Sequence, residues 1–368
     1  MLKRLFSGSN WPYALVPFIP IAIVLELGHA SATIIFVTSA LGVIPTAALM
    51  GKATEELAAR SGPGIGGFLN VTFGNAPELI IALFALGKGL HEVVKASLVG
   101  SILGNVLLVL GAAMFFGGLG RERQVFNRTA ASAQSSMLLL AGAAITMPAV
   151  FTLVSHGSLP GPHDEIRDFP SKVEHLSLGI AILMIGVYAA GLVFSMKTHR
   201  DLFNPQREED AEAHEPWTVR RSVVMLGIAG AAVGVMSEIL VGSIHHAAES
   251  AGLSEFFIGA IVIAIVGNAA EHWVAVLVAR KDQMDLAVNI AIGSSAQIAL
   301  FVIPVLILVS FVLGPGPMPF VLNGFELAAI LFAVTIANQV TQEGESTWHE
   351  GVLLLAVYAV FIITFAFA

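Results

Sequence analysis

Charged residues are scarce in this chain of 368 residues. Asp, Glu, Lys and Arg together make up 12% of it, against about a quarter in soluble domains. Hydrophobic residues make up 56%, and the mean hydropathy is +0.83. Charge-free stretches repeatedly reach the ~20 residues that a helix needs to cross a bilayer core; they are 5–25, 31–51, 96–120, 129–154 and 176–196. The composition therefore predicts a polytopic membrane protein.

Cysteine is absent, which excludes disulfide bonds and thiolate metal sites but assigns no compartment. The net charge is −8 and no basic patch occurs, so nucleic acid is not expected as a partner. The chain begins with MLKR and an apolar run that contains three prolines. This start is more typical of an uncleaved first span than of a signal peptide, because no small-residue cleavage site is followed by a soluble domain.

Breaks between the apolar stretches divide the chain into eleven predicted spans. The breaks fall at clusters of glycine and proline, such as SGPG at 61–64 and GPGPMP at 314–319, which favour turns. The predicted spans are 6–26, 31–58, 64–87, 93–119, 128–154, 172–197, 218–247, 255–280, 285–313, 320–341 and 350–367. The predicted fold class is therefore an all-α polytopic membrane protein with eleven transmembrane helices.

Lysine and arginine are distributed unevenly between the two sides of this arrangement. Fourteen of the 18 fall on the side of the amino terminus, and the other side keeps Lys88, Lys95, Arg167 and Lys172. Cytoplasmic loops carry an excess of these two residues. The amino terminus is therefore predicted to lie in the cytoplasm and the carboxyl terminus outside.

One phrase occurs twice, as GNAPELI at 74–80 and GNAAEHW at 267–273, 193 residues apart. The same shift also aligns Ile65-Gly66 with Ile258-Gly259 and Gly100-Ser101 with Gly293-Ser294. The two copies fall in the third and eighth predicted spans, and an odd separation reverses their direction across the membrane. Inverted repeats of this kind build alternating-access transporters whose site lies near the midplane.

Isolated carboxylates stand in the middle of three predicted spans. Glu78 and Glu271 are each the only charged residue within the repeated segments, and Glu238 is the only one between Ser222 and Ala248. Glu326 lies nearer a span end and is expected at the membrane surface. Since no Lys or Arg is expected at comparable depth, the three buried acids must face water, carry protons or bind a cation. The pattern indicates a pathway for cations.

Each repeated phrase also supplies further oxygen ligands. Asn75 and Glu78 are three residues apart on one helical face, and Asn268 and Glu271 repeat the pair. Pro77 frees a backbone carbonyl one turn earlier, because it has no N–H group. Carboxylate, amide and carbonyl oxygens suit a hard cation such as Ca²⁺. The other candidates are the close-approach glycines Gly74 and Gly267 and the polar residues Ser101, Ser294, Ser295 and Gln297; the serines serve equally well to pack helices closely.

At these residues the chain resembles the calcium/cation antiporter superfamily, in its calcium/proton exchanger branch. The segments that carry the resemblance are TFGNAPELI, IVGNAAEH, GSILGN (100–105), GSSAQIA (293–299), ATEELAARSG (53–62) and SEILVGSIHHA (237–247). The resemblance covers spans two to eleven. It implies an unpaired first helix and two inverted five-helix repeats, with the domains 1–30, 31–200, an acidic cytoplasmic linker at 201–216, and 217–368.

The resemblance also implies roles for single residues. The family's two central glutamates correspond to Glu78 and Glu271, which would bind the metal ion. Its flanking amides correspond to Asn75, Asn268 and Gln297. His272 favours the proton-coupled branch, whereas Gly104 departs from relatives that carry a polar residue opposite Gln297. Spans two and seven, with Pro45 and Glu238 at equivalent places, are expected to slide or tilt and so open each side in turn.

The implied function is secondary active transport, with calcium exported from the cytosol in exchange for protons and no cofactor. Ca²⁺, protons and the bilayer are the expected partners, in a prokaryotic plasma (inner) membrane, and assembly as a homo-oligomer is left open. A sodium-coupled or other divalent cation exchanger and a passive cation channel are the alternatives. An enzyme is not expected, because no predicted span carries the buried aspartates of a membrane protease.

The linker at 201–216 holds the densest acidic cluster of the chain, which includes Glu208, Glu209, Asp210 and Glu212. A solvated connector is one interpretation. The resemblance raises another, in which an acidic helix attracts calcium before transport.

The predicted topology can be tested with single cysteines, because the natural chain has none. Cysteine in place of Ser158 should react with an impermeant reagent in intact cells, since the loop at 157–171 is predicted outside. Cysteine in place of Ala211 should react only after permeabilisation. The opposite labelling pattern would reverse the orientation and the direction of export.

Overall fold

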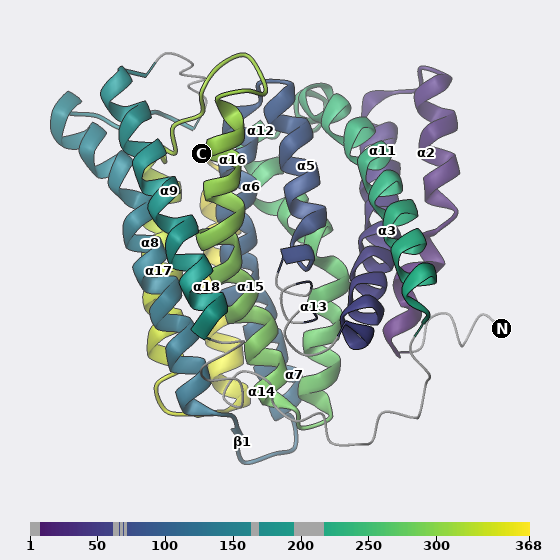
Figure 1. Cartoon of the computed structure of the whole chain (residues 1–368), viewed down its shortest axis with the longest axis vertical. Helices are drawn as coiled ribbons and strands as arrows, with labels where there is room; N and C mark the ends of the chain where they lie inside the picture. The colour runs from purple at the N-terminus through teal and green to yellow at the C-terminus, as the bar shows by residue number, and fades with distance from the viewer. Residues whose placement is uncertain (1–7, 62–65, 67–68, 70–71, 163–168, 195–216) are drawn as a thin grey trace.

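The structure is a computed structural model, and it describes residues 8–61, 66, 69, 72–162, 169–194 and 217–368. These residues are almost entirely helical (Figure 1). Among them, nine helices are long and apolar enough to cross a membrane, and two shorter apolar helices, α5 (Ala76–Gly87) and α17 (Gly324–Val340), occupy the third and tenth predicted spans. The chain is therefore a helical membrane protein, and the count of eleven spans remains a prediction.

The first part of the chain runs from an amino-terminal 3₁₀ helix to the linker. Its elements are η1 (Gly8–Leu15), α2 (Phe18–Leu27), α3 (Ala32–Arg60), α5, α6 (His91–Leu103), the π-helix η2 (Gly104–Val109), α7 (Leu110–Gly118), α8 (Arg128–His156) and α9 (Ser171–Val193). The acidic linker prediction, with Glu208, Glu209, Asp210 and Glu212, lies outside the described residues.

The second part contains three more π-helical segments. Its elements are α11 (Val219–Ala251), α12 (Glu255–Phe257), η4 (Ile258–Ile263), α13 (Ala264–Arg280), α14 (Met284–Val288), η5 (Asn289–Gly293), α15 (Ser294–Gln297), η6 (Ile298–Val302), α16 (Ile303–Ser310), α17 and α18 (Trp348–Ala366). The strands β1 (Gln124–Val125) and β2 (Glu345–Ser346) pair antiparallel. π-Helical turns widen a helix and often occur at functional sites.

Helix ends follow the local sequence. The side chain of Asn127 accepts the N–H of Ala130 at 3.0 Å and so begins α8, and Gly157, with a φ of +78°, ends it. Asn323 begins α17 with a reciprocal capping box, in which the Glu326 side chain accepts the backbone N–H of Asn323. These caps satisfy backbone groups that lipid cannot satisfy.

The two glutamate helices begin differently. α5 begins only at Ala76, after a turn at Gly74 and Asn75, and Pro77 lies in its first turn. α13 passes through the equivalent positions without a break, because Ala270 stands where the first copy has Pro77. A proline costs a helix one hydrogen bond and clashes with the preceding turn. The repeated phrase therefore produces a helix start in one copy and a continuous helix in the other.

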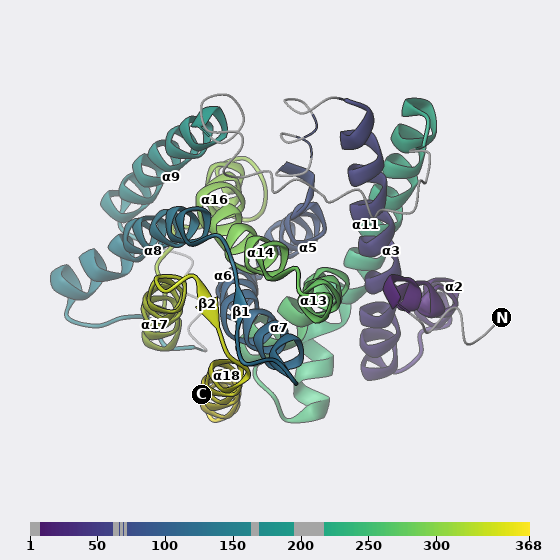
Figure 2. The same ribbon diagram turned by 90° about the horizontal axis from the view of Figure 1, so that it is seen from below.

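The helices form two blocks with the glutamate helices between them. α3 and α11 lie side by side with α2 at one edge of the molecule, and α6 to α9 and α16 to α18 form the other block (Figure 1). Figure 2, seen along the helices, shows α5 and α13 in the middle. The site helices thus contact both the α3–α11 pair and the larger block.

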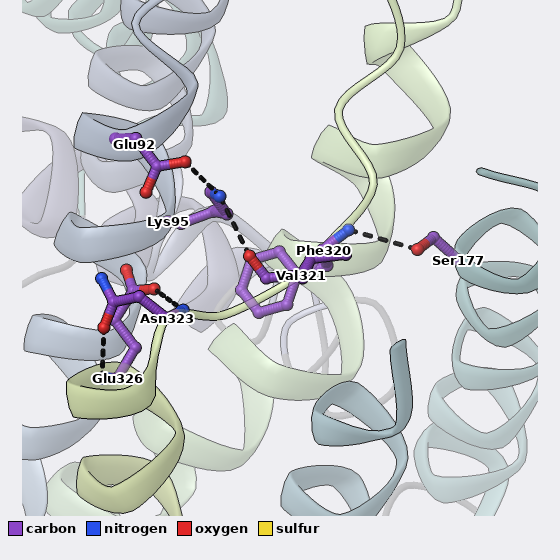
Figure 3. A network of polar contacts seen from close by, with 7 residues as sticks. All are labelled: Glu92, Lys95, Ser177, Phe320, Val321, Asn323 and Glu326. Atoms are coloured by element: carbon purple, nitrogen blue, oxygen red, sulfur yellow. Dashed lines mark hydrogen bonds and ion pairs between the residues drawn. The ribbon is translucent and has the colours of Figure 1, made fainter. Parts of the chain in front are cut away.

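Two charged residues lie deeper than the sequence indicates. Glu326, expected at the membrane surface, is fully buried, and Lys95 is 1% exposed, although no lysine was expected at depth. The chain between α16 and α17 folds back over both side chains (Figure 3). A residue near the end of a span is exposed only if the following loop leaves the protein surface uncovered. Here the loop between α16 and α17 covers that surface, so both side chains are buried.

Small residues bring α6 and η4 into backbone contact. A Cβ atom added to Gly100 would collide with the carbonyl oxygen of Ala260, and one added to Gly259 would lie 3.0 Å from the carbonyl oxygen of Val93. Glycine at such positions lets two backbones approach within a membrane.

Gly100→Ala is therefore expected to destabilise the protein, because a backbone oxygen cannot move aside as a side chain can. The loss should be about 1–3 kcal/mol, as for other overpacked cores. Gly186→Ala is the matched control, since its added methyl group meets nothing within 4 Å. Thermal unfolding in detergent, followed by tryptophan fluorescence, measures both variants. Equal melting temperatures would contradict the close contact.

Candidate cation site

Glu78 and Glu271 face the same cavity, as the repeat predicts. Glu78 lies in the first turn of α5 and Glu271 in α13, and both line a cavity of about 590 Å³. The two carboxylates are close enough to interact electrostatically. Gly267 of α13 lies directly across from Glu78, since a Cβ atom added there would be 3.6 Å from the Cγ atom of Glu78. The glycine keeps the space between the two helices open.

Two asparagines have their amide nitrogens occupied and their amide oxygens free. Asn75 Nδ2 donates to Gln297 Oε1 at 2.7 Å, and Asn268 Nδ2 donates to Ser101 Oγ at 3.2 Å and to the Ala264 carbonyl at 3.0 Å. The Oδ1 atom of each asparagine is buried and accepts no hydrogen bond from the described residues. The two Oδ1 atoms therefore remain available, and a hard cation such as Ca²⁺ prefers oxygen ligands of this kind.

The carboxylates also keep oxygen atoms available. Glu78 is 8% exposed, and its Oε2 atom accepts no hydrogen bond from the described residues. Ser294 Oγ donates to Glu271 Oε2 at 3.4 Å. A buried oxygen without a partner costs free energy unless a proton, a water molecule or a cation satisfies it. The described residues contain no group of three or more His, Asp or Glu side chains placed to hold a metal ion, so a cation here would also need amide ligands.

The cavity extends from the glutamates to the carboxyl-terminal end of α3. Lys52 and Glu55 line it there, and both are exposed. Gln134 and Asn289 line another part and are joined by a hydrogen bond of 2.5 Å from Nε2 to Oδ1. Sequence analysis did not single out these four residues. Glu55 lies within the quoted segment ATEELAARSG, but Gln134 carried no signal, because a lone amide in an apolar helix is ordinary packing.

Most of the predicted site residues meet at the cavity. The cavity wall includes Gly74, Glu78, Gly267, Glu271, Ser294 and Gln297, and Asn75, Asn268 and Ser101 are joined to it or to one another as described above. Pro45 is buried within α3 and precedes Ala47, which lines the cavity. Glu238 lies elsewhere: its side chain is exposed, its carbonyl accepts a hydrogen bond from Lys88 Nζ at 3.4 Å, and it is not part of the wall.

His272 points away from the cavity, although it follows Glu271 directly. Its Nε2 atom lies 3.2 Å from Asn105 Oδ1 in η2, and a Cβ atom added to Gly104 would be 3.9 Å from its ring. Consecutive residues of a helix point in different directions, and the one after Glu271 is directed toward η2. Gly104 borders this imidazole. Sequence analysis missed Asn105, although it lies within the quoted segment GSILGN.

Asn105→Ala should therefore destabilise the protein, because it leaves the ring of His272 without its partner. A buried polar group without its hydrogen bond costs about 1–3 kcal/mol. Combining the change with His272→Phe should recover part of the loss, since both polar groups are then absent. Melting temperatures of the three variants and the natural chain complete the cycle. Strictly additive losses would indicate that the two side chains do not interact.

Comparison with known proteins identifies the family of the chain. The sequence profile of the sodium/calcium exchanger protein family matches residues 31–197 and 221–367. The chain is 44% identical over 373 residues to a Ca(2+)/H(+) antiporter of Synechocystis sp., with 96% of each chain covered. It is 43% identical to the Ca(2+)/H(+) antiporter ChaA of Bacillus subtilis, with 94% of this chain and 96% of that one covered.

Solved structures give the same result. The structure of native YfkE superposes with a TM-score of 0.82 at 39% identity, covering 97% of this chain and 100% of that one. The H+/Ca2+ exchanger CAX, at 15% identity and a TM-score of 0.73, shares the fold. The chain therefore belongs to the sodium/calcium exchanger protein family and, within it, to the calcium/proton exchanger branch.

Proposed function

We propose that the protein exports calcium from the cytosol in exchange for protons, at a site formed by Glu78 and Glu271. The observation that carries this proposal is the pair of carboxylates facing one cavity, Glu78 buried and Glu271 half-buried, beside asparagine oxygens that accept no hydrogen bond from the described residues. Relatives 44% and 43% identical are named Ca(2+)/H(+) antiporters, which supports the choice of ions.

Charge balance explains how the two fluxes are coupled. Two carboxylates carry two negative charges, which one Ca²⁺ or two protons neutralise. Two charges at close range in a protein interior repel several times more strongly than in water. The empty, doubly charged site is therefore costly to carry through a closed state, and loss of calcium favours protonation. Only the loaded site crosses, so an inward proton gradient drives calcium outward.

Alternating access requires two parts that move relative to one another. α3 and α11 form one pair against the site helices, which supports the proposal that these two helices slide or tilt. The cavity reaches exposed residues at the carboxyl-terminal end of α3, as expected of a state open to one side. In the proposed cycle the opposite route opens when α11 moves, and Glu238 then lines it.

An unpaired first helix followed by two inverted five-helix repeats is the proposed layout. The family profile matches two segments, 31–197 and 221–367, with α2 before the first. The π-helices η2 and η6 begin 194 residues apart, close to the repeat shift of 193. Both observations support the layout, and an oligomer is compatible with it.

The proposed location is a plasma membrane, with the amino terminus in the cytoplasm. The excess of Lys and Arg on the amino-terminal side supports this orientation. A 38% identical relative from Schizosaccharomyces pombe is named a vacuolar calcium ion transporter, so the type of membrane is specific to each member.

One transport experiment distinguishes the proposed exchanger from a sodium-coupled exchanger and from a passive channel. A sodium-coupled exchanger would take up ⁴⁵Ca into vesicles in response to a sodium gradient, and a passive channel would do so without any gradient of a second ion. The proposed exchanger should take up calcium only when the vesicle interior is acidic. Uptake that is independent of the pH gradient would contradict the proposal.

Glu78→Gln and Glu271→Gln should each abolish exchange while the protein still folds. Glutamine imitates the protonated carboxyl group but cannot release a proton or supply a negative charge. Glu249→Gln is the matched control, because Glu249 is exposed on α11 and does not line the cavity. Uptake driven by a pH gradient measures all three, and size-exclusion chromatography verifies folding. Proton-coupled uptake by either site variant would refute the mechanism.

A further inference from the structure

The connector between α16 and α17 includes residues 314–323 and forms no helix or strand, yet its carboxyl-terminal part, 318–323, is buried. Met318, Phe320, Val321, Leu322 and Asn323 are at most 1% exposed. Irregular backbone at membrane depth is tolerated only where protein satisfies its polar groups. The side chains that satisfy these groups therefore determine where the connector lies.

Three of these side chains come from different helices. Ser310 Oγ accepts the N–H of Met318 at 2.9 Å, and Ser177 Oγ of α9 accepts the N–H of Phe320 at 3.2 Å. Lys95 Nζ of α6 donates to the Val321 carbonyl at 3.0 Å and forms an ion pair with Glu92 (Figure 3). Lysine is almost never buried without a partner. Lys95 is thus the charged anchor of the connector.

Two acidic side chains lie around this anchor. Glu92 forms the ion pair with Lys95, and Glu326 is also buried nearby. The amino-terminal ends of α6 and α17 also lie here, and each acts as roughly half a positive charge. The Glu326 carboxylate accepts the Asn323 N–H at 2.9 Å. Each acidic group thus has a compensating partner, an ammonium group or a helix amino terminus, and the cluster holds the carboxyl-terminal end of the connector in place.

The other end of the connector contacts the helix that carries Glu78. Gly314 has a φ of +92°, and a Cβ atom added to it would lie 2.5 Å from the carbonyl oxygen of Leu86 and 4.0 Å from the Cα atom of Gly87. Leu86 and Gly87 are the last two residues of α5. Twelve residues of helix form a rod of about 18 Å, so a shift at this end moves Glu78 at the other.

The second half of the site is held in a corresponding way. The connector between α7 and α8 contacts the end of α13, where Gln124 Nε2 donates to the Ala279 carbonyl at 2.9 Å and Arg121 Nη2 donates to the Arg280 carbonyl at 3.1 Å. Ala279 and Arg280 stand 193 residues after Leu86 and Gly87. Each connector therefore holds the end of the glutamate helix that belongs to the other half of the chain.

We propose that the connector 314–323, anchored by Lys95, positions Glu78 by fixing the far end of α5, and thereby sets the affinity of the site for calcium. The proposal rests on the proposed role of Glu78 in binding calcium. Lys95 and Gly314 are positioning residues: neither lines the cavity, and both act through α5.

Gly314→Ala tests the contact with α5. Its methyl group would press on the Leu86 carbonyl and should raise the KM for calcium about tenfold, because a displacement near 1 Å at a site has large effects. Gly316→Ala, two residues further on, adds the same methyl group where nothing lies within 4 Å, and should leave KM unchanged. A lower melting temperature with unchanged KM would give the connector a purely structural role and overturn the proposal.

Lys95→Met tests the anchor, with Lys172→Met as the control at an exposed lysine. Lys95→Met alone leaves two buried carboxylates against two helix ends and should lower the melting temperature. Adding Glu92→Gln restores neutrality, so the double variant should fold. It should still show a raised KM, since the Val321 carbonyl has lost its donor. A folded double variant with the KM of the natural chain would overturn the anchoring role.

The same uptake assay distinguishes failure of the positioning role from failure of the proposed function. Calcium uptake driven by a pH gradient is measured first for the natural chain, Gly316→Ala and Glu78→Gln. If the natural chain shows no uptake, or Glu78→Gln retains it, the proposed function fails. If those three behave as expected and Gly314→Ala equals Gly316→Ala in KM, only the positioning role fails. If Gly314→Ala does not fold, the double variant at Lys95 and Glu92 decides the question.

Discussion

The arrangement of this protein depends on two carboxylates that share one cavity between α5 and α13. A carboxylate in a low-dielectric interior needs a counter-charge. Among the described residues that line the cavity there is no arginine, and the lysine, Lys52, lies at the exposed end. The counter-charge must therefore come from ions that enter the site. The surrounding contacts fit this need, because the amide nitrogens of Asn75 and Asn268 already donate hydrogen bonds while their amide oxygens accept none from the described residues.

A second group of buried acidic side chains has its compensating partners within the protein. The cluster of Glu92, Lys95 and Glu326 has its balancing charges built in, from an ammonium group and two helix ends. A balanced buried cluster has no need of a mobile ion and is suited to holding a connector in place. The same residue type, glutamate, thus serves as the proposed exchangeable ion site at position 78 and as a structural element at position 326.

The two halves are related but not identical, and the differences follow from single residues. Pro77 makes α5 begin at the site, whereas Ala270 allows α13 to continue through it. His272 and Asn105 form a polar pair on one side, where the repeat shift places Leu79 and Ile298 on the other. A transporter that works between two unequal compartments does not require equal halves, and the broken and continuous helices give each glutamate a different backbone environment.

The sequence by itself determined the class of fold, the repeated phrase and most residues of the candidate site that meet at the cavity. These features are encoded locally: hydrocarbon requires long charge-free helices, and a lone glutamate within such a helix marks a candidate ion site. Only the tertiary structure decided which neighbours each residue has. It placed His272 against Asn105, left Glu238 outside the cavity and buried Lys95 and Glu326 beneath a folded-back loop. Helix rotation and loop path arise from contacts between segments far apart in the chain, and no local pattern records them.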